Sequence, residues 1–446
     1  MIAALVSTAL VVAQSPEAIR ESLRHNPHFA IPVYVAYPPL PIGDIAAAPE
    51  GFEPFYFSLA GRHGSRYDVS TSRFTDIIDI LKRGAECSIL TDTGKRLLAR
   101  LEAILAAQGE RKGELADLGY RQWLSIANRA YDNFAPVFQQ GSVDAMSSPT
   151  LRCVFSMIAF NQGLKERNPR LVVNQDAQER DLPVVRPVND NPLMTESDRQ
   201  LLRDTSKKGA WIETRTAWDD SRDVSSFLSK ITTDADRLVK ECGGKTPFRI
   251  ARYAYAALVV AENFEAGDRA LVTELFTTDE IYGFYVHHTA SWINCRIGVG
   301  NDFAEMMNSF AGSMIDDIVR KVNAAIKGEN PNCADLRFTH DTHMAPLMSA
   351  IGYVGCQPTY SADLEKATTS FNHALMTPMA ANLQLVLYRN KAGKVYVRSL
   401  VNERDAYLPI KCKTAPFYPW SDFCKHVEKS MKVLDASRER VLKQQK

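Results

Sequence analysis

The stretch EPFYFSLAGRHGSR, residues 53–66, joins an aromatic-rich apolar run to a polar turn. Its first part, Glu53 to Ala60, has the composition of a buried strand, and Gly61 and Gly64 mark the turn in which that strand ends. In open α/β folds, ligand sites lie at the carboxyl ends of the strands. The stretch therefore predicts a central strand and a ligand site directly after it.

Strand and helix signals alternate on both sides of this stretch and change in the middle of the chain. Hydrophobic residues recur at helical spacing from Thr91 to Gln108, and Pro149 is expected to open another helix. Four further short runs have strand composition: 144–148, 335–339, 382–388 and 395–400. The middle of the chain is helical by periodicity, and its last helix is expected over 302–326.

These signals predict the fold class and the domain organisation. We expect an α/β fold with a doubly wound, mixed and mainly parallel sheet that helices flank on both faces. The core would be discontinuous, over residues 40–190 and 330–430, and a mostly helical subdomain over 191–329 would be inserted into it.

The overall charge limits the partners that the chain can take. Lys and Arg total 53 against 52 for Asp and Glu, so the formal net charge of the 446 residues is +1. A general binder of nucleic acid would carry a basic excess. The expected partner is a small anionic ester held by a few convergent arginines, with no nucleic acid and no stable membrane insertion, and the oligomeric state stays open.

The N-terminus predicts export. An apolar stretch from Ile2 to Val12 is too short to span a bilayer, and small residues follow it, so residues 1–13 are interpreted as a signal peptide of a periplasmic or extracellular protein. The alternative is a buried N-terminal strand or helix. An exported chain with eight cysteines favours disulfides, and Cys412 with Cys424 is the best single pair.

Arg62 and Arg66 flank His63 in the first polar cluster. A guanidinium group presents a planar fork of donors that matches phosphate oxygens. An imidazole between two of them is a plausible nucleophile toward phosphorus, and Gly64 would let backbone amides approach the anion beside a helix that starts just after. The alternative is a surface turn with solvated arginines.

Two further clusters carry groups of the same chemistry. His340 and Asp341 follow the strand expected over 335–339, where a carboxylic acid could protonate a leaving group and the imidazole could donate to a phosphate oxygen. Arg152 lies in the first turn of the helix after Pro149 and could aim a third guanidinium at the same anion. A metal site at His340, Asp341 and His343 is the alternative for the second cluster.

The order of these motifs resembles one superfamily. RHGxR after the first strand, SSPxxR near residue 150, a helical insert and His-Asp-Thr after a late strand resemble the histidine phosphatases, in the acid-phosphatase branch that includes phytases and multiple inositol polyphosphate phosphatases. Further residues resemble the inositol polyphosphate phosphatase group in particular. They are Gly113-Glu114-Leu115, Gly119-Tyr120-Arg121-Gln122, Ala127, Arg129, Tyr131, Phe134, Phe138 and Ser156 to Phe160.

The resemblance implies a role for each matching residue. His63 would be the nucleophile and Asp341 the proton donor, and no cofactor or metal would be needed. The phosphate pocket would consist of four side chains: Arg62, Arg66, Arg152 and His340. Tyr67, Thr342 and His343 are expected as contacts of the leaving group.

Two departures from the family pattern concern the substrate. Asp68 stands where many relatives carry Pro, and His340-Asp341-Thr342 matches phytases and general acid phosphatases where many inositol polyphosphate phosphatases carry His-Ala-Glu. Phytate heads the expected substrates, and sugar phosphates or nucleotides are the alternative. Candidate contacts for further phosphates are Arg186, Lys207, Lys208 and Arg215. Two other classes stay open, an inactive phosphate-ester binding protein and a metal-dependent phosphatase.

Overall fold

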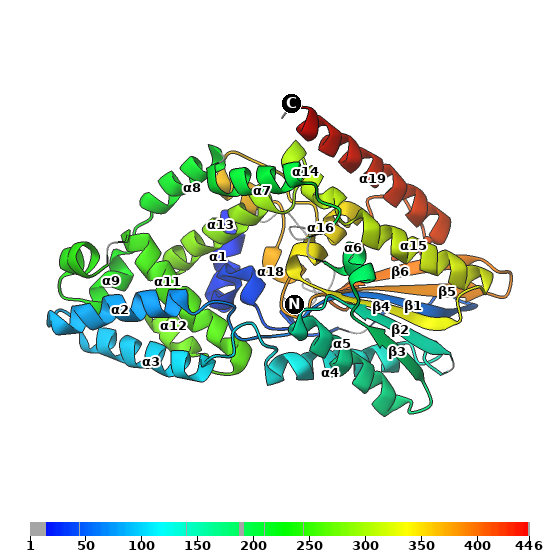
Figure 1. The fold of residues 1–446 in the computed structure, drawn as a ribbon, viewed down its shortest axis with the longest axis horizontal. Coiled ribbons are helices and arrows are strands. Elements are labelled where there is room, and N and C mark those ends of the chain that lie inside the picture. The colour runs from blue at the N-terminus through cyan, green and yellow to red at the C-terminus, as the bar shows by residue number, and fades with distance from the viewer. Residues whose placement is uncertain are drawn as a thin grey trace.

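The computed structural model describes residues 15–43, 45–139, 141–186, 191–208, 210–243 and 245–444. The expected signal peptide, residues 1–13, lies outside them, as do the side chains of Lys208 and Cys242. Figure 1 shows a sheet with helices on both faces at one end of the molecule and a helical region at the other. None of the described helices is long and apolar enough to cross a bilayer.

One mixed sheet forms the α/β part, in the order β3-β2-β4-β1-β5-β6-β7, with β8 on β6. β3, β2, β4 and β1 are parallel to one another, and the remaining pairs are antiparallel. The strands have these bounds: β1 Phe52–Arg62, β2 Ser142–Ser147, β3 Val172–Asp176, β4 Asn332–Thr339, β5 Asn382–Asn390, β6 Val395–Val401, β7 Arg404–Asp405 and β8 Phe417–Pro419. The five predicted strand runs are confirmed, and β5 and β6 form the expected hairpin.

The two faces of the sheet have separate cores because side chains alternate along each strand. Tyr56 and Ala60 of β1 pack with α15 (Gly312–Lys327), α16 (Asp341–Ile351) and α19 (Trp420–Lys443). Phe57 and Leu59 face the other way and pack with α4 (Asp117–Asn133) and α5 (Leu151–Arg167). The predicted doubly wound class is therefore confirmed.

A third core belongs to the helical region. It joins helices from three parts of the chain: α1 Pro16–His25, α2 Ser72–Glu86, α3 Asp92–Gln108, α9 Ser225–Ile231, α11 Pro247–Val260, α12 Arg269–Leu275 and α13 Thr278–Cys295. The predicted helix near 91–108 exists as α3, but α2 and α3 pack with α11 and α9 and not on the sheet. Hydrophobic periodicity identifies the buried face of a helix without identifying what covers it.

The remaining helices of the described chain lie within or between the two regions. Longer ones are α7 Glu196–Lys208, α8 Ala210–Asp220 and α14 Asp302–Ser309. Short ones are η1 Pro27–Ala30, η2 Pro32–Tyr34, η3 Glu179–Asp181, α6 Leu182–Val185, α10 Ala235–Arg237, η5 Leu238–Gly243, η6 Ala261–Phe264, α17 Leu364–Thr368 and α18 His373–Met376.

Two sequence predictions about this part are wrong. The single helix expected over 302–326 is two helices, since the chain breaks between Ser309 and Gly312 and lets α14 pack against α19. The Cys412–Cys424 disulfide is absent, and both residues are free thiols, as are the other five described cysteines. The Cys412 thiol instead lies 3.4 Å from the Phe417 carbonyl oxygen, while Cys424 packs from α19 against the core.

Candidate active site

Two polar clusters separated by most of the chain meet because β1 and β4 are adjacent and parallel. Arg62 pairs with Thr339 in the register of these strands, so His63 and His340 leave the sheet side by side. The His63 backbone N–H donates to the Thr339 carbonyl at 3.0 Å, and the two imidazole rings lie 5.5 Å apart, edge to face. The candidate site is therefore at the carboxyl ends of the two central parallel strands, as predicted.

His63 is held in the tautomer that a nucleophile needs. Its Nδ1 lies 2.9 Å from the Gly64 carbonyl oxygen, which can only accept, so Nδ1 carries the proton and Nε2 keeps its lone pair. The side chain is 2% exposed. Burial lowers the pKa of His63 well below its usual range, and Arg152, Arg62 and Arg66 lower it further. The imidazole thus stays neutral in acid.

Arg62 is completely buried at the floor of the site. Its Nη2 forms an ion pair of 2.8 Å with Asp341 Oδ2, and its Nη1 donates to the Thr377 carbonyl at 2.8 Å. Its Nε is buried without a partner. Burial lowers the pKa of Arg62 to about 10, so the side chain stays charged at acidic and neutral pH. The guanidinium is oriented before any ligand arrives.

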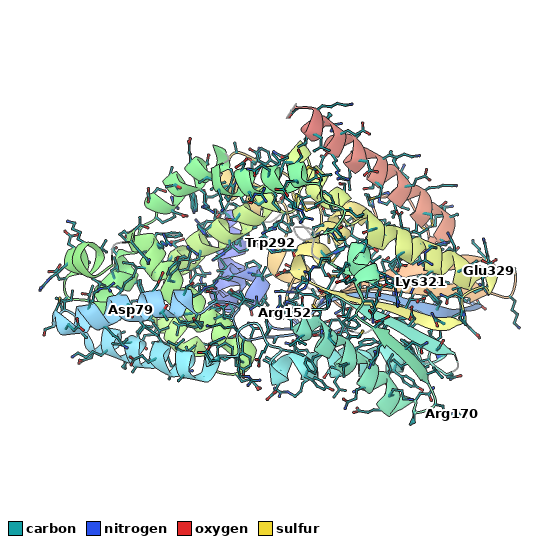
Figure 2. All side chains as sticks on the ribbon, viewed as in Figure 1. Asp79, Arg152, Arg170, Trp292, Lys321 and Glu329 are labelled. Atoms are coloured by element: carbon teal, nitrogen blue, oxygen red, sulfur yellow. The ribbon has the colours of Figure 1, made fainter. Side chains whose placement is uncertain are left out.

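Arg66 and Arg152 approach from two other elements. Arg66 Nη1 donates to the Tyr67 carbonyl oxygen at 2.9 Å. Arg152, at the second position of α5, lies 3.4 Å from His340 Nδ1 and 3.5 Å from the Gly113 carbonyl oxygen. Figure 2 shows Arg152 where the sheet region meets the helical region. Both arginines have a buried Nε without a partner.

His340 and Asp341 supply the remaining groups. Burial and the nearby Arg152 lower the pKa of His340 to about 3, so its imidazole is neutral. Asp341 is the first residue of α16, and its side chain is 18% exposed. Burial alone would raise the pKa of Asp341, but Arg62 and His340 outweigh it and lower the pKa. Without a ligand, Asp341 is therefore an ionised carboxylate.

Gly64 serves a different purpose from the predicted one. Its N–H donates to Ser156 Oγ at 3.0 Å and is not free for an anion, and the next helix, α2, begins only at Ser72. A Cβ on Gly64 would lie 2.5 Å from the Gly119 carbonyl oxygen. The glycine is thus required because the turn packs directly on the backbone of α4.

Asp68 is fully buried among cations. Its Oδ1 accepts from the Val69 N–H at 2.8 Å and lies 3.7 Å from Arg66 Nη1, and its Oδ2 lies 3.5 Å from Arg73 Nη1. Arg73 also donates to Tyr34 Oη at 2.6 Å. The Asp68 carboxylate therefore lies between Arg66, an expected phosphate ligand, and Arg73.

The three expected leaving-group contacts lie in different surroundings. Tyr67 stacks on Phe264 with 4.9 Å between ring centroids, and Thr342 is partly exposed beside Asp341. His343 is fully buried, and its Nδ1 lies 2.6 Å from the Arg186 carbonyl oxygen. His343 therefore contacts the segment at Arg186, and its Nε2 is buried without a partner. Its contact with the leaving group stays a prediction.

The helical region adds buried polar groups that sequence reasoning missed. His373 is completely buried with neither ring nitrogen paired, and Asp341 and Arg62 are close enough to shift its pKa, which burial lowers to about 3. Among the further buried polar atoms without a partner in the described part of the chain, five belong to this region or to the residue beside it: Thr377 Oγ1, His288 Nε2, Arg252 Nε, Arg215 Nε and Trp218 Nε1. Burial lowers the pKa of His288, and the nearby Arg252 and His373 lower it further. Unpaired polar groups thus continue from the site into the helical region.

Of the expected contacts for further phosphates, two are near these groups. Arg186 affects the pKa of His340, and Arg215 affects that of His287 on α13. Lys207 is exposed on α7. No group of three or more His, Cys, Asp or Glu among the described residues is arranged to hold a metal ion.

Comparison with known proteins agrees with this geometry. A family model described as the histidine phosphatase superfamily (branch 2) matches residues 61–402. The thiamine-repressible acid phosphatase of Schizosaccharomyces pombe is 21% identical over 400 residues, which cover 86% of this chain and 80% of that protein.

Two solved structures share the fold at low identity. The multiple inositol polyphosphate phosphatase of Bifidobacterium longum, in complex with inositol hexasulfate, is 17% identical with a TM-score of 0.70, and the match covers 88% of this chain and 97% of that one. The phytase from D. castellii is 16% identical with a TM-score of 0.66, and the match covers 90% and 85%.

Proposed function

This chain belongs to branch 2 of the histidine phosphatase superfamily, and from that premise we propose that it is an exported histidine acid phosphatase that removes phosphate from inositol polyphosphates through a phosphohistidine on His63. The enzyme class, a phosphoric monoester hydrolase, follows from the family. The intermediate, the substrate and the export are the proposal. Export rests on the apolar stretch from Ile2 to Val12.

In the first step, the phosphoryl group of the substrate lies among Arg62, Arg66, Arg152 and His340. The unpaired N–H groups of the arginines donate to its oxygens and offset the charge that develops on them. His63 Nε2 attacks phosphorus in line with the leaving oxygen. A nitrogen–phosphorus bond forms, the phosphorus–ester oxygen bond breaks, and the leaving oxygen takes a proton from Asp341.

Asp341 must first acquire that proton. In the free protein Arg62 and His340 keep the pKa of Asp341 low. A bound phosphate brings negative charge beside the carboxylate and competes for Arg62, and both effects raise the pKa of Asp341. A monoanionic phosphate ester also carries a proton into the site. Turnover is therefore expected to be fastest in acid, where His63 remains neutral because of its own low pKa.

In the second step, water replaces the departed alcohol. The water oxygen attacks phosphorus, and the Asp341 carboxylate accepts a proton from this water. The nitrogen–phosphorus bond breaks, inorganic phosphate leaves, and His63 Nε2 regains its lone pair. After the second step Asp341 is protonated and His63 is neutral, as they were when the first step began, and Asp341 loses its proton when the phosphate has left.

The observation that carries the substrate class is the continuation of unpaired buried donors beyond the catalytic pocket. A single phosphate would be satisfied by the groups around His63, yet Arg252, Arg215 and His288 also keep unpaired nitrogens in the helical region. Buried donors without partners are costly unless a ligand satisfies them. A ligand with several phosphates fits this arrangement, and the B. longum relative was solved with inositol hexasulfate.

The alternative is a broad acid phosphatase acting on sugar phosphates or nucleotides, which the S. pombe relative, an acid phosphatase, favours. A catalytically inactive binding protein is a third class. The three differ in whether phosphate is released and from which esters.

Phosphate release from phytate and p-nitrophenyl phosphate, measured at pH 4 to 7 with EDTA present, tests the proposal. Wild type is expected to hydrolyse both, and His63→Ala to lose at least about a thousand-fold in kcat on both. Arg252→Met should raise KM for phytate about ten-fold or more and leave p-nitrophenyl phosphate unchanged. Arg440→Met, at an exposed ion pair on α19, is the matched control.

Three results would contradict parts of the proposal separately. Undiminished turnover by His63→Ala would rule out the phosphohistidine. Equal effects of Arg252→Met on both esters would remove the polyphosphate assignment and favour the broad phosphatase. A silent wild type would favour the binding protein, and activity that depends on added metal would favour a metal-dependent enzyme.

A further inference from the structure

Three exposed apolar side chains gather beside the catalytic pocket. Val69, Leu151 and Phe155 are 49%, 66% and 47% exposed. They are three of the seven large hydrophobic side chains that the described part of the chain exposes, and the other four are spread over the molecule: Val172, Leu193, Val354 and Val433. Apolar groups that gather at the surface mark a binding site more often than scattered ones do.

The first turns of α5 place an apolar stripe next to a polar one. Residues four apart lie on the same side of a helix, so Leu151 and Phe155 form one stripe, and Arg152 and Ser156 form the adjacent one. The polar stripe faces the site, because Arg152 reaches His340 and Ser156 Oγ accepts from the Gly64 N–H. The apolar stripe therefore begins where the phosphate-binding surface ends.

Val69 extends this apolar surface across the loop at Gly113. The Gly113 N–H donates to the carbonyl of the residue before Val69 at 2.9 Å. A Cβ built on Gly113 would lie 3.3 Å from Val69 Cγ1 and 3.4 Å from Arg152 Nη1. Val69 and the Arg152 guanidinium thus lie against the same residue, Gly113, so Val69 borders the cationic pocket on that side.

We propose that Val69, Leu151 and Phe155 form an apolar lip that binds the aryl part of a phosphomonoester whose phosphate lies on Arg152 and His340. The inference rests on the proposed phosphatase activity and names the surface that contacts an aromatic leaving group. The two sides of the mouth differ in chemistry, since the helical side offers unpaired cationic donors and the α5 side offers apolar surface. An ester with an aromatic leaving group gains contact area on the α5 side alone.

Two aryl esters of similar leaving-group acidity isolate the lip from the chemistry. Phenyl phosphate and 2-naphthyl phosphate release phenols of nearly equal acidity, so the ratio of their kcat/KM values reports the contact of the second ring. Wild type is expected to prefer 2-naphthyl phosphate about three- to ten-fold. The double variant Leu151→Ser/Phe155→Ser should bring the ratio to about one. Its activity on phytate should stay at the wild-type level, and its activity on phenyl phosphate, with one ring, should fall less than that on 2-naphthyl phosphate.

The control is Val354→Ser/Val433→Ser, which removes two equally exposed apolar side chains away from the site and should keep the wild-type ratio. An unchanged ratio in the lip variant would overturn the proposal, as would an equal loss on all three esters, which would assign Leu151 and Phe155 to positioning Arg152. Failure of the phosphatase mechanism is distinguishable, because it would appear as turnover of phenyl phosphate by His63→Ala.

Discussion

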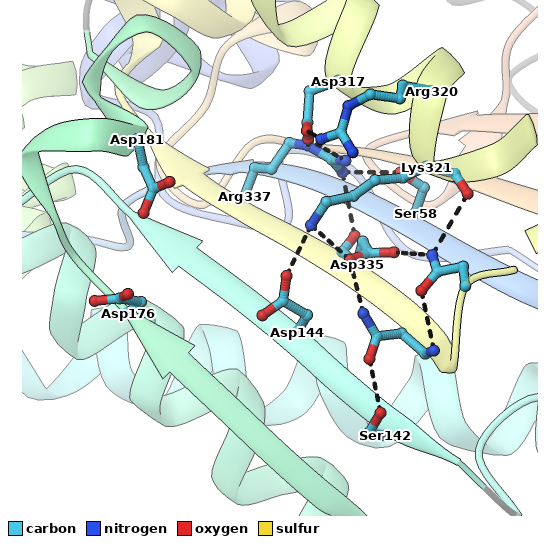
Figure 3. A network of polar contacts seen from close by, with 12 residues as sticks. Ser58, Ser142, Asp144, Asp176, Asp181, Asp317, Arg320, Lys321, Asp335 and Arg337 are labelled. Atoms are coloured by element: carbon cyan, nitrogen blue, oxygen red, sulfur yellow. Dashed lines mark hydrogen bonds and ion pairs between the residues drawn. The ribbon is translucent and has the colours of Figure 1, made fainter. Parts of the chain in front are cut away.

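Strands β1 and β4 lie beside two sets of charged or polar residues, one between the sheet and α15 and one at the carboxyl edge of the sheet. Lys321 of α15 lies 2.7 Å from both Asp144 of β2 and Asp335 of β4, and Arg337 of β4 lies 2.6 Å from Asp317 of α15. Figure 3 shows this network, in which Lys321 reaches a carboxylate on either side. At the edge, the same strands lead into His63 and His340.

The two sets differ in how completely their charges are paired. Every cation of the network has a carboxylate partner, and Asp335 accepts from Lys321, Tyr56 and Asn330 as well. At the edge, Asp341 pairs with Arg62 alone, while Arg152 meets only a neutral imidazole and a carbonyl. A buried ion pair is destabilised strongly when one partner is removed, because the other charge is left uncompensated. A buried charge without a partner carries such a cost until a ligand supplies the counter-charge. The difference separates structure from function along one pair of strands.

The largest expected effect on stability comes from breaking the network. Asp317→Ala leaves the Arg337 guanidinium, which is fully buried, without its carboxylate. Removing one partner of a buried ion pair costs about 3–5 kcal/mol. Urea unfolding should show this loss, and kcat of the remaining folded protein should be unchanged.

Asp302→Ala is the matched control, since it breaks the exposed ion pair with Arg440. Such pairs contribute about 0–1 kcal/mol. If both variants lost the same small amount, the network would not be the stabilising set that its pairing indicates.

Some of this comparison could be predicted from sequence. Each site motif ends a strand or begins a helix, so local composition was enough to place His63, Arg152 and His340 at element ends. Parallel strands of one sheet then bring their carboxyl ends to one edge. The resemblance to a family assigned the roles, and the fold confirms the juxtaposition.

The positions of other groups near the site cannot be predicted from the local sequence pattern. Arg252 and His373 lie in helices whose sequences give only a buried face. That His373 lies near Asp341, and both His373 and Arg252 near His288, depends on how the helical region packs against the sheet. The pairing of Cys412 with Cys424 failed for the same reason, because a spacing of twelve residues says nothing about where the thiols point. Contacts between elements, rather than within them, are what the sequence pattern leaves undetermined.

A smaller effect tests the unpaired set directly. Inorganic phosphate at a hundred times its dissociation constant should stabilise wild type by about 2.7 kcal/mol, because it binds the folded state alone. Arg152→Met should abolish most of that shift without lowering the stability of the ligand-free protein, since Arg152 has no carboxylate partner to lose.

Asp317→Ala gives the opposite pattern, which sharpens the comparison. It should be destabilised without ligand and yet show the full shift in melting temperature with phosphate. Thermal unfolding of the three proteins with and without phosphate measures both quantities. A phosphate shift that survived Arg152→Met and disappeared in Asp317→Ala would reverse the assignment of the two sets.

The smallest effect concerns pH and the unpaired His373. Burial lowers the pKa of His373 to about 3 in the folded protein, whereas an unfolded histidine titrates near 6.5. Below about pH 6.5 the unfolded state therefore binds a proton that the folded state does not, and the free energy of unfolding falls by up to about 1.4 kcal/mol per pH unit.

His373→Phe, which keeps a ring against Trp292 and Phe371, should remove this component. Its free energy of unfolding should therefore fall less than that of wild type between pH 7 and pH 5. His25→Phe on the exposed side of α1 should keep the wild-type slope. Equal slopes in all three proteins would mean that His373 gains a partner in solution, and would move it from the unpaired set to the paired one.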